Sequence, residues 1–580
     1  MISEIKAAPP VADQRPVEIT QHGKTRVDPY AWLHDENWQE VLRDPSTLEA
    51  DIRQHLEAEV AYYEKATAPL EDLRQTIFKE VRGRIKEDES SVPMPDGPYE
   101  YYTRFRKGGD YPVFARRARG DDRAAEEVIF DSDAERGDSA FFDIGSVIRS
   151  PDHTLTAYAT DRLGSEYYDI RIRRLKDGLE WEETIPSTSG EIVWSKDGKG
   201  FFYVERDDNQ RPKRVKFHAL GTGAEADPLV YEESDDAMDL WIDKTSPETY
   251  LVIGLDTGET SEAWVVPLDA PETAPHLIAP RLEGQLYDID HAGDYFYIRT
   301  NADGAVDFKI MRAPATDPGR AHWQDWVPHQ QGVYLTGFAL FEKYIVREER
   351  ENARPRMVVG DYDGNTHEIT MNEAAYALYL VGWDEFKTDI VRFAYESPSV
   401  PKQIFDYRMD RKERFLRKTQ TVPSGHNESL YAVDVVVAKG EDGAEIPVTV
   451  LRLKRTPLDG SAPLFLYGYG SYGSYDDDGF SVGVLSLVDR GVVYARAHIR
   501  GGSAKGRHWY LDGKFGKKEN SFRDFNAAAR AVIERNYTRQ GKIIAYGASA
   551  GGLLVGAAIN LAPELYAGIL ADVPFVDVLT

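Results

Sequence analysis

The middle of this 580-residue chain is a succession of short β-rich runs, and their spacing constrains the fold more than any other feature. The runs begin near Tyr99, Thr154, Phe201, Tyr250, Tyr295, Tyr344 and Asp389. Successive starts lie about 45 to 55 residues apart, which is the period of a four-stranded propeller blade. We therefore expect a seven-bladed β-propeller. An array of stacked β-sandwiches is the alternative.

After about residue 425 the pattern changes to strands that alternate with helices. Alternating apolar residues at 431–438 and 447–453 flank a Glu-Asp-Gly turn and predict a β-hairpin. The apolar runs 464–467 and 492–498 predict buried strands of a mostly parallel sheet, and residues 521–535 predict a helix. The apolar stripe of that helix consists of Phe522, Phe525, Ala529 and Val532. This order is typical of an α/β domain.

The N-terminal part has a helical pattern. Between residues 45 and 79 apolar side chains recur at spacings of three and four. They are Leu48, Ile52, Leu56, Val60 and Tyr63. We expect residues 1–75 to form a helical extension that packs on the α/β domain, residues 76–422 to form the propeller and residues 423–580 to form the α/β domain.

The composition argues against several kinds of function. The chain has no cysteine, which rules out disulfides, cysteine-bound zinc and a thiol nucleophile. A net charge of −28 argues against nucleic acid as a partner, because phosphate binding needs clustered Lys and Arg. The acidic, proline-containing start and the lack of an apolar run of about 18 to 20 residues argue against a secretory signal and a membrane span. We expect a cytoplasmic protein with no cofactor, metal or membrane partner.

Residues 543–555 combine a short apolar run, the sequence Gly547-Ala548-Ser549-Ala550-Gly551 and a second segment of apolar and small residues. This order predicts a strand, a sharp turn and a helix. Glycine on both sides lets the strand and the helix approach each other without a Cβ clash. A serine at such a turn is held above the sheet edge, where the Ala550 N–H can help to hold an oxyanion. The α/β context indicates that Ser549 is a nucleophile.

A second source of oxyanion donors follows the strand at 464–467. Residues 467–473 alternate tyrosine with glycine and serine, and we expect their strand to lie beside the elbow strand. Glycine frees the backbone there, so that a tyrosine hydroxyl can reach the elbow. A serine hydroxyl is a poor nucleophile near neutral pH, so it also needs a base, usually a histidine that an aspartate orients.

Several long motifs occur in order along the chain. They are Asp28-Pro29-Tyr30 with Trp32-Leu33, YGYGSYG at 467–473, LVDRGVVYA at 487–495, DGKFGKKENSFRDF at 512–525, the GASAGG elbow and VPFVDV at 573–578. With these motifs the chain resembles the prolyl oligopeptidase family of serine peptidases, in particular its oligopeptidase B branch. The resemblance implies a propeller inserted between an N-terminal extension and a C-terminal α/β-hydrolase domain. It also implies Ser549 as nucleophile, with the Tyr469 hydroxyl and the Ala550 N–H as oxyanion donors.

The resemblance further implies acidic pockets that accept Arg or Lys of short peptides. Asp477 matches the first position of the family's acidic pair, whereas Gly479 occupies the second. A basic side chain can pair with such a carboxylate, although a solvated acidic loop is the alternative. We name Asp477 and Tyr472 as substrate-binding residues. The expected activity is that of a serine endopeptidase that cleaves after Arg or Lys, with the propeller as a size filter.

The C-terminal end departs from the family pattern. No histidine follows Ser549, and Asp572 and Asp577 come too early to be the family's acid. The histidines upstream are in the wrong order to be the base: His426, His498 and His508. We expect a chain truncated within its α/β domain, nearly inactive by itself. The alternatives are a non-catalytic propeller binding protein that has genuinely lost this end, and a prolyl oligopeptidase that prefers Pro.

Overall fold

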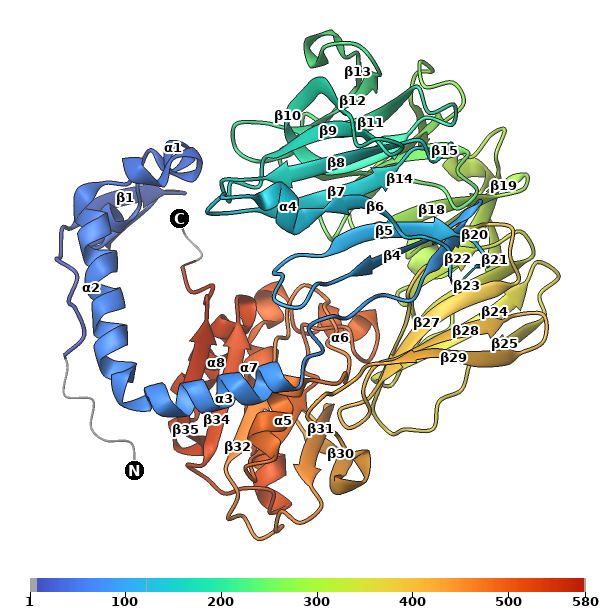
Figure 1. Ribbon diagram of the computed structural model, residues 1–580. Coiled ribbons are helices and arrows are strands. Elements are labelled where there is room, and N and C mark those ends of the chain that lie inside the picture. Colours follow the sequence, from blue (N-terminus) through green and yellow to red (C-terminus); the bar gives the residue numbers. More distant parts are fainter. Residues whose placement is uncertain (1–7, 122, 578–580) are drawn as a thin grey trace.

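The computed structural model describes residues 8–121 and 123–577 (Figure 1). It contains an N-terminal arm, a ring of antiparallel sheets and an α/β domain. Val578, the last residue of the C-terminal motif named above, lies outside the described residues. None of the helices in the described ranges is long and apolar enough to cross a membrane.

The N-terminal arm combines helices with a β-hairpin that the sequence did not reveal. Its elements are β1 (Val17–Gln21), β2 (Lys24–Asp28), α1 (Trp38–Arg43), α2 (Ala50–Thr67) and α3 (Glu71–Gly83). The predicted helical segment 45–79 is confirmed by α2 and α3. In its apolar stripe Ile52 is buried, whereas Leu56, Val60 and Tyr63 are half or more exposed. Most of that stripe therefore faces solvent in this structure.

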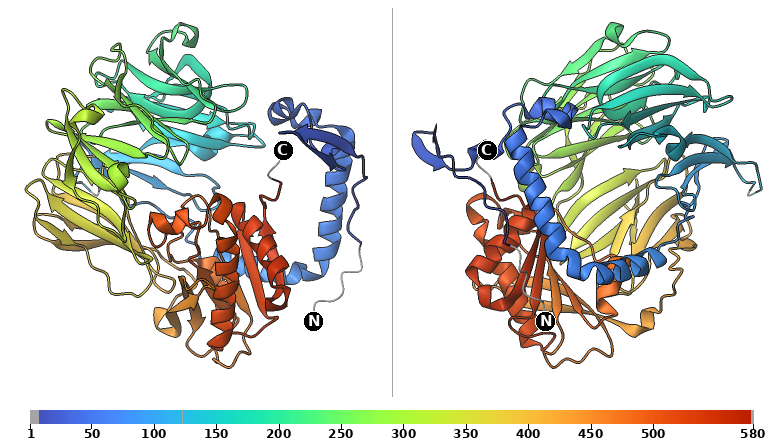
Figure 2. Two further views of the ribbon diagram at one scale, coloured as in Figure 1. Left: turned by 180° about the vertical axis from the view of Figure 1, so that it is seen from behind. Right: turned by 60° about the vertical axis from the view of Figure 1, so that its left-hand side comes forward.

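The arm contacts both of the larger parts of the molecule. α3 runs along the α/β domain beside α5 (Val482–Val488), as Figures 1 and 2 show. Directly after α3, Arg84 donates to Ser486 Oγ at 2.9 Å and pairs with Asp489 at 2.6 Å. At the other end of the arm, Arg43 of α1 pairs with Asp208 of the propeller at 2.9 Å. The arm thus bridges the propeller and the α/β domain.

Five sheets of the ring are four-stranded and antiparallel. They are β3 (Met94–Asp96), β4 (Tyr99–Arg104), β5 (Val113–Ala118), β6 (Glu127–Asp131); β14 (Asp239–Lys244), β15 (Tyr250–Asp256), β16 (Ser261–Pro267), β17 (His276–Ala279); β18 (Tyr287–Ala292), β19 (Tyr295–Thr300), β20 (Lys309–Pro314), β21 (Gln324–Val327); β22 (Val333–Leu340), β23 (Tyr344–Glu351), β24 (Arg354–Asp361), β25 (Thr366–Glu368); and β26 (Ala377–Leu380), β27 (Ile390–Glu396), β28 (Gln403–Arg408), β29 (Glu413–Thr419). A short helix, α4 (Ser132–Arg136), follows β6.

The predicted count of seven blades is wrong, because the remaining strands form one seven-stranded sheet. Its strands are β7 (Asp143–Arg149), β8 (Leu155–Asp161), β9 (Tyr168–Arg174), β10 (Glu180–Trp194), β11 (Gly200–Arg206), β12 (Pro212–Ala219) and β13 (Leu229–Glu232). The 15-residue β10 pairs with β9 through its first half and with β11 through its second half. Register shifts bend this strand without ending it, so two sequence repeats share one sheet.

Side chains join the two ends of the ring. Arg119, which follows β5, pairs with Glu385 ahead of β27 at 2.5 Å. Arg149 of β7 pairs with Asp96 of β3 at 2.5 Å and with Asp384 at 2.7 Å. The first and last four-stranded sheets are therefore neighbours, which excludes an open array of sandwiches (Figure 2).

The α/β domain is a six-stranded sheet in the order β30-β31-β33-β32-β34-β35. Its strands are β30 (Tyr431–Lys439), β31 (Glu445–Leu453), β32 (Leu464–Tyr467), β33 (Val493–Ala497), β34 (Ile543–Ala548) and β35 (Tyr566–Asp572), and its helices after α5 are α6 (Arg507–Leu511), α7 (Glu519–Glu534) and α8 (Ala550–Leu561). β30 and β31 form the predicted hairpin. β32 is parallel to β33 and β34, and β34 is parallel to β35. The alternation of strands and helices is confirmed.

The core of this domain lies between the sheet and α7 with α8. Phe525, Ala529 and Val532 of the predicted stripe are fully buried in it, and Phe522 packs on its edge.

The last described strand of the ring ends at Thr419 and the α/β sheet begins at Tyr431. The domain boundaries at 75/76 and 422/423 remain predictions.

Candidate active site

The predicted elbow is a sharp turn between β34 and α8. Ser549 stands alone between the two elements, with φ 54° and ψ −121°. A positive φ is rare for a residue other than glycine and persists only where its surroundings enforce it. Its side chain is exposed, while Ala550 behind it is buried as the first residue of α8. The backbone strain thus lifts one hydroxyl out of the surface.

The glycines beside Ser549 are needed for this geometry. A Cβ on Gly547 would lie 2.1 Å from the carbonyl oxygen of Gly551, which is far inside contact distance. A Cβ on Gly551 would lie 2.9 Å from the Gly468 carbonyl oxygen and 3.4 Å from a ring carbon of Tyr469. The strand, the helix and the tyrosine-glycine loop therefore meet at backbone contact, as the sequence pattern predicted.

The tyrosine-glycine loop lies beside the elbow because β32 pairs with β34. It brings Tyr469 to Ser549, whose side chain hydrogen-bonds the Tyr469 hydroxyl. Burial and the neighbouring Tyr472 raise the pKa of Tyr469, more than the contact with Ser549 lowers it. The phenol therefore keeps its proton at neutral pH. The Ala550 N–H is at the start of α8, where backbone donors lack an acceptor within the helix.

Tyr472 faces a cavity of about 360 Å³ between the propeller and the α/β domain. Its φ is 58°, and its side chain is 71% exposed. The propeller contributes Trp241, Asp288 and Arg299 to the walls of this cavity, and α6 contributes Tyr510. An exposed aromatic ring at such a cavity is available to contact a substrate.

The structure separates the three aspartates of the acidic run. Asp477 forms an ion pair with Arg350 of β23, a residue 127 positions away that the sequence analysis did not name. Asp478 is buried, accepts a hydrogen bond from Thr449 at 2.7 Å and lies 3.3 Å from His498. Asp476 lies close enough to the tyrosine-glycine loop to affect it electrostatically. Its charge acts on the tyrosines of the loop, including Tyr469.

The upstream histidines have other contacts. His498 Nε2 lies 3.1 Å from the Thr449 hydroxyl, and His426 Nε2 lies 2.7 Å from the Ser399 carbonyl oxygen. His508 lies beside Trp509. None of these contacts of the three histidines is with Ser549.

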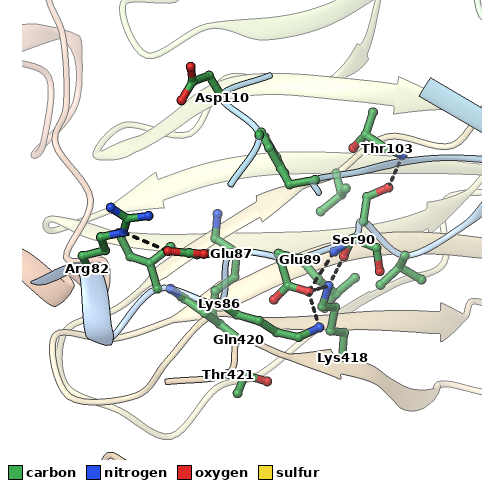
Figure 3. Close-up of a pocket in the computed structure, with 18 of the residues that line it drawn as sticks. Arg82, Lys86, Glu87, Glu89, Ser90, Thr103, Asp110, Lys418, Gln420 and Thr421 are labelled. Carbon is green, nitrogen blue, oxygen red and sulfur yellow. Dashed lines mark hydrogen bonds and ion pairs between the residues drawn. The ribbon is translucent and has the colours of Figure 1, made fainter. Parts of the chain in front are cut away.

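A second cavity has a volume of about 740 Å³ (Figure 3). Its lining includes residues between 82 and 92, which lead from α3 into the propeller, and residues between 402 and 421, at the end of the propeller. Arg82 and Glu87 pair on one side of the cavity at 2.8 Å. Lys418 pairs with Glu89 at 2.5 Å. Because these charges satisfy one another and no predicted site residue lines the cavity, we do not assign the reaction to it.

Within residues 8–121 and 123–577, no group of three or more His, Asp or Glu side chains is placed to hold a metal ion. The absence of a metal and a cofactor remains a prediction.

A β-propeller joined to an α/β domain with an exposed, strained serine defines a class of propeller-bearing α/β-hydrolases. The prolyl oligopeptidase N-terminal β-propeller domain matches residues 9–420, and the prolyl oligopeptidase family matches residues 479–580. The chain belongs to the prolyl oligopeptidase family, and it is a serine peptidase, hence a hydrolase.

Relatives of the oligopeptidase B and protease 2 type match nearly the whole chain. Dipeptidyl aminopeptidase BI of Pseudoxanthomonas mexicana is 39% identical over 99% of this chain and 80% of its own length. Protease 2 of Moraxella lacunata is 33% identical over 98% of this chain and 81% of its own length. The structure of oligopeptidase B from Leishmania major superposes with a TM-score of 0.93 at 32% identity, over 99% of this chain and 83% of that one.

Proposed function

We propose that this protein is an oligopeptidase that hydrolyses short peptides after Arg or Lys through an acyl-enzyme on Ser549. The observation that carries the proposal is the position of Ser549, which is exposed and strained between β34 and α8 with Tyr469 in contact. A serine nucleophile needs this geometry to reach a bound carbonyl. Family membership supports the reaction class.

In this proposal Ser549 Oγ attacks the carbonyl carbon of the scissile bond and passes its proton to a general base. The carbonyl oxygen becomes an oxyanion, which the Tyr469 hydroxyl and the Ala550 N–H stabilise. The C–N bond then breaks, the amine leaves with the proton, and water hydrolyses the ester through a second oxyanion. The raised pKa of Tyr469, caused mainly by burial, suits a proton donor.

The proposed preference for basic side chains depends on the acidic run at residues 476–478. Burial and the charge of Asp476 raise the pKa of Tyr467. The negative charge of Asp476 therefore lies close to the loop that carries Tyr469. Asp477 is already paired with Arg350, and a substrate cation would have to compete with that partner. In the proposal Tyr472 contacts the peptide in the cavity between the domains.

The proposal also covers the domain boundaries and the location in the cell. We propose residues 1–75, 76–422 and 423–580 as the extension, the propeller and the catalytic domain. A cytoplasmic location stays a prediction that cell fractionation would test. The base and the acid remain unassigned, because the described histidines contact other groups.

A fluorophosphonate and a peptide panel test the proposal on the full-length protein. We expect the phosphonate to label Ser549, Ser549→Ala to lose the label, and kcat/KM to fall by about 10⁶-fold in that variant. Ser461→Ala, at an exposed serine of the same domain, should react like the wild type. Labelling elsewhere, or none, would contradict the nucleophile and favour the non-catalytic binding protein. Preference for Pro over Arg and Lys before the scissile bond would favour a prolyl oligopeptidase.

A further inference from the structure

The loop that carries Tyr469 has an unusual backbone. Gly470, Tyr472 and Gly473 all have positive φ, at 68°, 58° and 67°. Glycine adopts a positive φ freely, whereas Tyr472 carries a side chain and keeps this conformation only because surrounding contacts enforce it. On the N-terminal side of Tyr469, the Gly468 N–H donates to the Tyr546 carbonyl at 3.3 Å. On its C-terminal side the Gly473 N–H donates to the Gly501 carbonyl at 3.0 Å, which leaves Gly470 and Ser471 to be held by other groups.

Lys518, the residue before α7, holds Gly470 and Ser471. Its Nζ donates to the Gly470 carbonyl at 2.5 Å and to Ser471 Oγ at 2.6 Å. Ser521 Oγ also lies near the Gly470 carbonyl, at 3.4 Å, but donates at 2.7 Å to the Arg500 carbonyl. Lys518 is thus the nearer donor to the residue that follows Tyr469.

We infer that Lys518 is a positioning residue whose ammonium fixes the loop at Gly470 and Ser471 and thereby aims the Tyr469 hydroxyl at the oxyanion. This inference rests on the proposed function, in which Tyr469 is an oxyanion donor. Lys518 touches neither the substrate nor Ser549 in this account. It acts through the loop backbone.

The charge of Lys518 has a free-energy cost, because the side chain is largely buried. Burial lowers its pKa to about 8. Its folded pKa is below the value of about 10.4 for an unfolded lysine, so protonation destabilises the fold below pH 8, and this cost disappears as the pH rises toward 10.4. The two hydrogen bonds to Gly470 and Ser471 offset part of this cost.

The other charged groups near Lys518 have partners of their own. Arg500, on the segment packed against the loop, pairs with Asp524 of α7 at 2.6 Å and with Asp442 at 2.5 Å. Lys517 pairs with Asp512 at 2.7 Å, and Lys514 pairs with Glu259 at 2.5 Å. Glu519 of α7 is exposed. The titratable groups of the loop itself are the phenols of Tyr467, Tyr469 and Tyr472, and the carboxylate of Asp476 follows close behind.

Three variants of the full-length protein test the inference by the rate at which a fluorophosphonate labels Ser549. Lys518→Met should lower the maximal labelling rate by about 10- to 100-fold, because a donor misplaced by about 1 Å costs up to about 10² in rate. The half-saturating phosphonate concentration should stay within twofold. Lys518→Arg should recover most of the rate. Lys517→Met, at the exposed neighbouring lysine, should behave like the wild type.

The pH profile keeps the test decisive if Lys518→Met fails to fold. In the wild type the labelling rate should fall as the pH rises through about 8, where the ammonium loses its charge-assisted hydrogen bonds. Lys518→Arg should move this alkaline limb upward by more than one pH unit, because a guanidinium stays protonated. Identical profiles, or a folded Lys518→Met that labels at the wild-type rate, would overturn the inference. No labelling of wild-type Ser549 at any pH would instead refute the proposed function.

Discussion

Ser549 and its neighbouring glycines meet opposite steric requirements. The serine carries a side chain at a positive φ, which costs of order 1–3 kcal/mol. Gly547 has no side chain, and only for that reason can β34 approach α8 closely enough to enforce the turn. The close packing that Gly547 permits therefore maintains the strained backbone conformation of Ser549.

We expect Gly547→Ala to lower the free energy of unfolding by about 1–3 kcal/mol, because its Cβ would overlap the Gly551 carbonyl oxygen and force the backbone apart. Labelling of Ser549 should fall together with stability. Gly556→Ala, on the same helix with open space around its Cβ, is the matched control and should raise stability by up to about 1 kcal/mol. Urea denaturation of both variants checks this, and equal effects would contradict the steric account.

At the scale of elements, α3 is held against α5 by contacts of two kinds. Arg84 is largely buried and reaches three acceptors, the carbonyl of Val482, the hydroxyl of Ser486 and the carboxylate of Asp489. Glu80, one turn earlier, forms a surface pair with Arg490 at 2.6 Å. A buried guanidinium with several acceptors contributes more than an exposed pair, which water and salt screen.

Arg84→Met should lower the free energy of unfolding by about 1–3 kcal/mol, because it removes the charged donor to the buried Ser486 hydroxyl, the Val482 carbonyl and the Asp489 carboxylate. Glu80→Gln is the matched surface control and should change stability little. Hydrogen exchange should quicken in both α3 and α5 in the first variant alone. If the two variants proved equally stable, the arm would be held by apolar contacts instead.

At the scale of the whole molecule, polar contacts join the propeller to the α/β domain, one of them at Tyr510 in the wall of the cavity that Tyr472 faces. Glu259, between β15 and β16, pairs with Lys514 at 2.5 Å and accepts a hydrogen bond from Tyr510. Glu396 accepts from the Phe480 N–H at 2.9 Å. Burial alone would raise the pKa of Glu259, but Lys514, Tyr510 and Arg507 outweigh it and hold the pKa below its usual value.

We expect Glu259→Gln to weaken the interface by about 1–3 kcal/mol at pH 7. Since the folded pKa of Glu259 is lowered, its contribution is fully present above the unfolded pKa near 4.5 and is lost as the pH falls through the folded value. The difference between wild type and variant should therefore shrink below about pH 4.5. Urea denaturation across pH, with the exposed Glu248→Gln as control, checks this. A difference that does not depend on pH would contradict the ion pair.

Much of the α/β domain and the core of the candidate site could be read from local sequence. The hairpin of β30 and β31, the buried stripe of α7 and the elbow at Ser549 each depend on neighbours a few residues away. Alternation, helical spacing and glycine position are local signals, so the sequence predicted these elements. The placement of the tyrosine-glycine loop beside the elbow followed from the parallel order of β32 and β34.

Contacts between distant segments were decided only by the tertiary structure. The count of blades was wrong because spacing does not reveal that β10 continues from one repeat into the next. The Arg350 partner of Asp477 and the Lys518 contact with Gly470 join residues that are far apart in the chain. The sequence by itself determined strands, helices and the strained serine, because these depend on short-range sterics and periodicity. The structure decided which charges are neutralised and which loop is held, because both depend on how the folded chain brings remote side chains together.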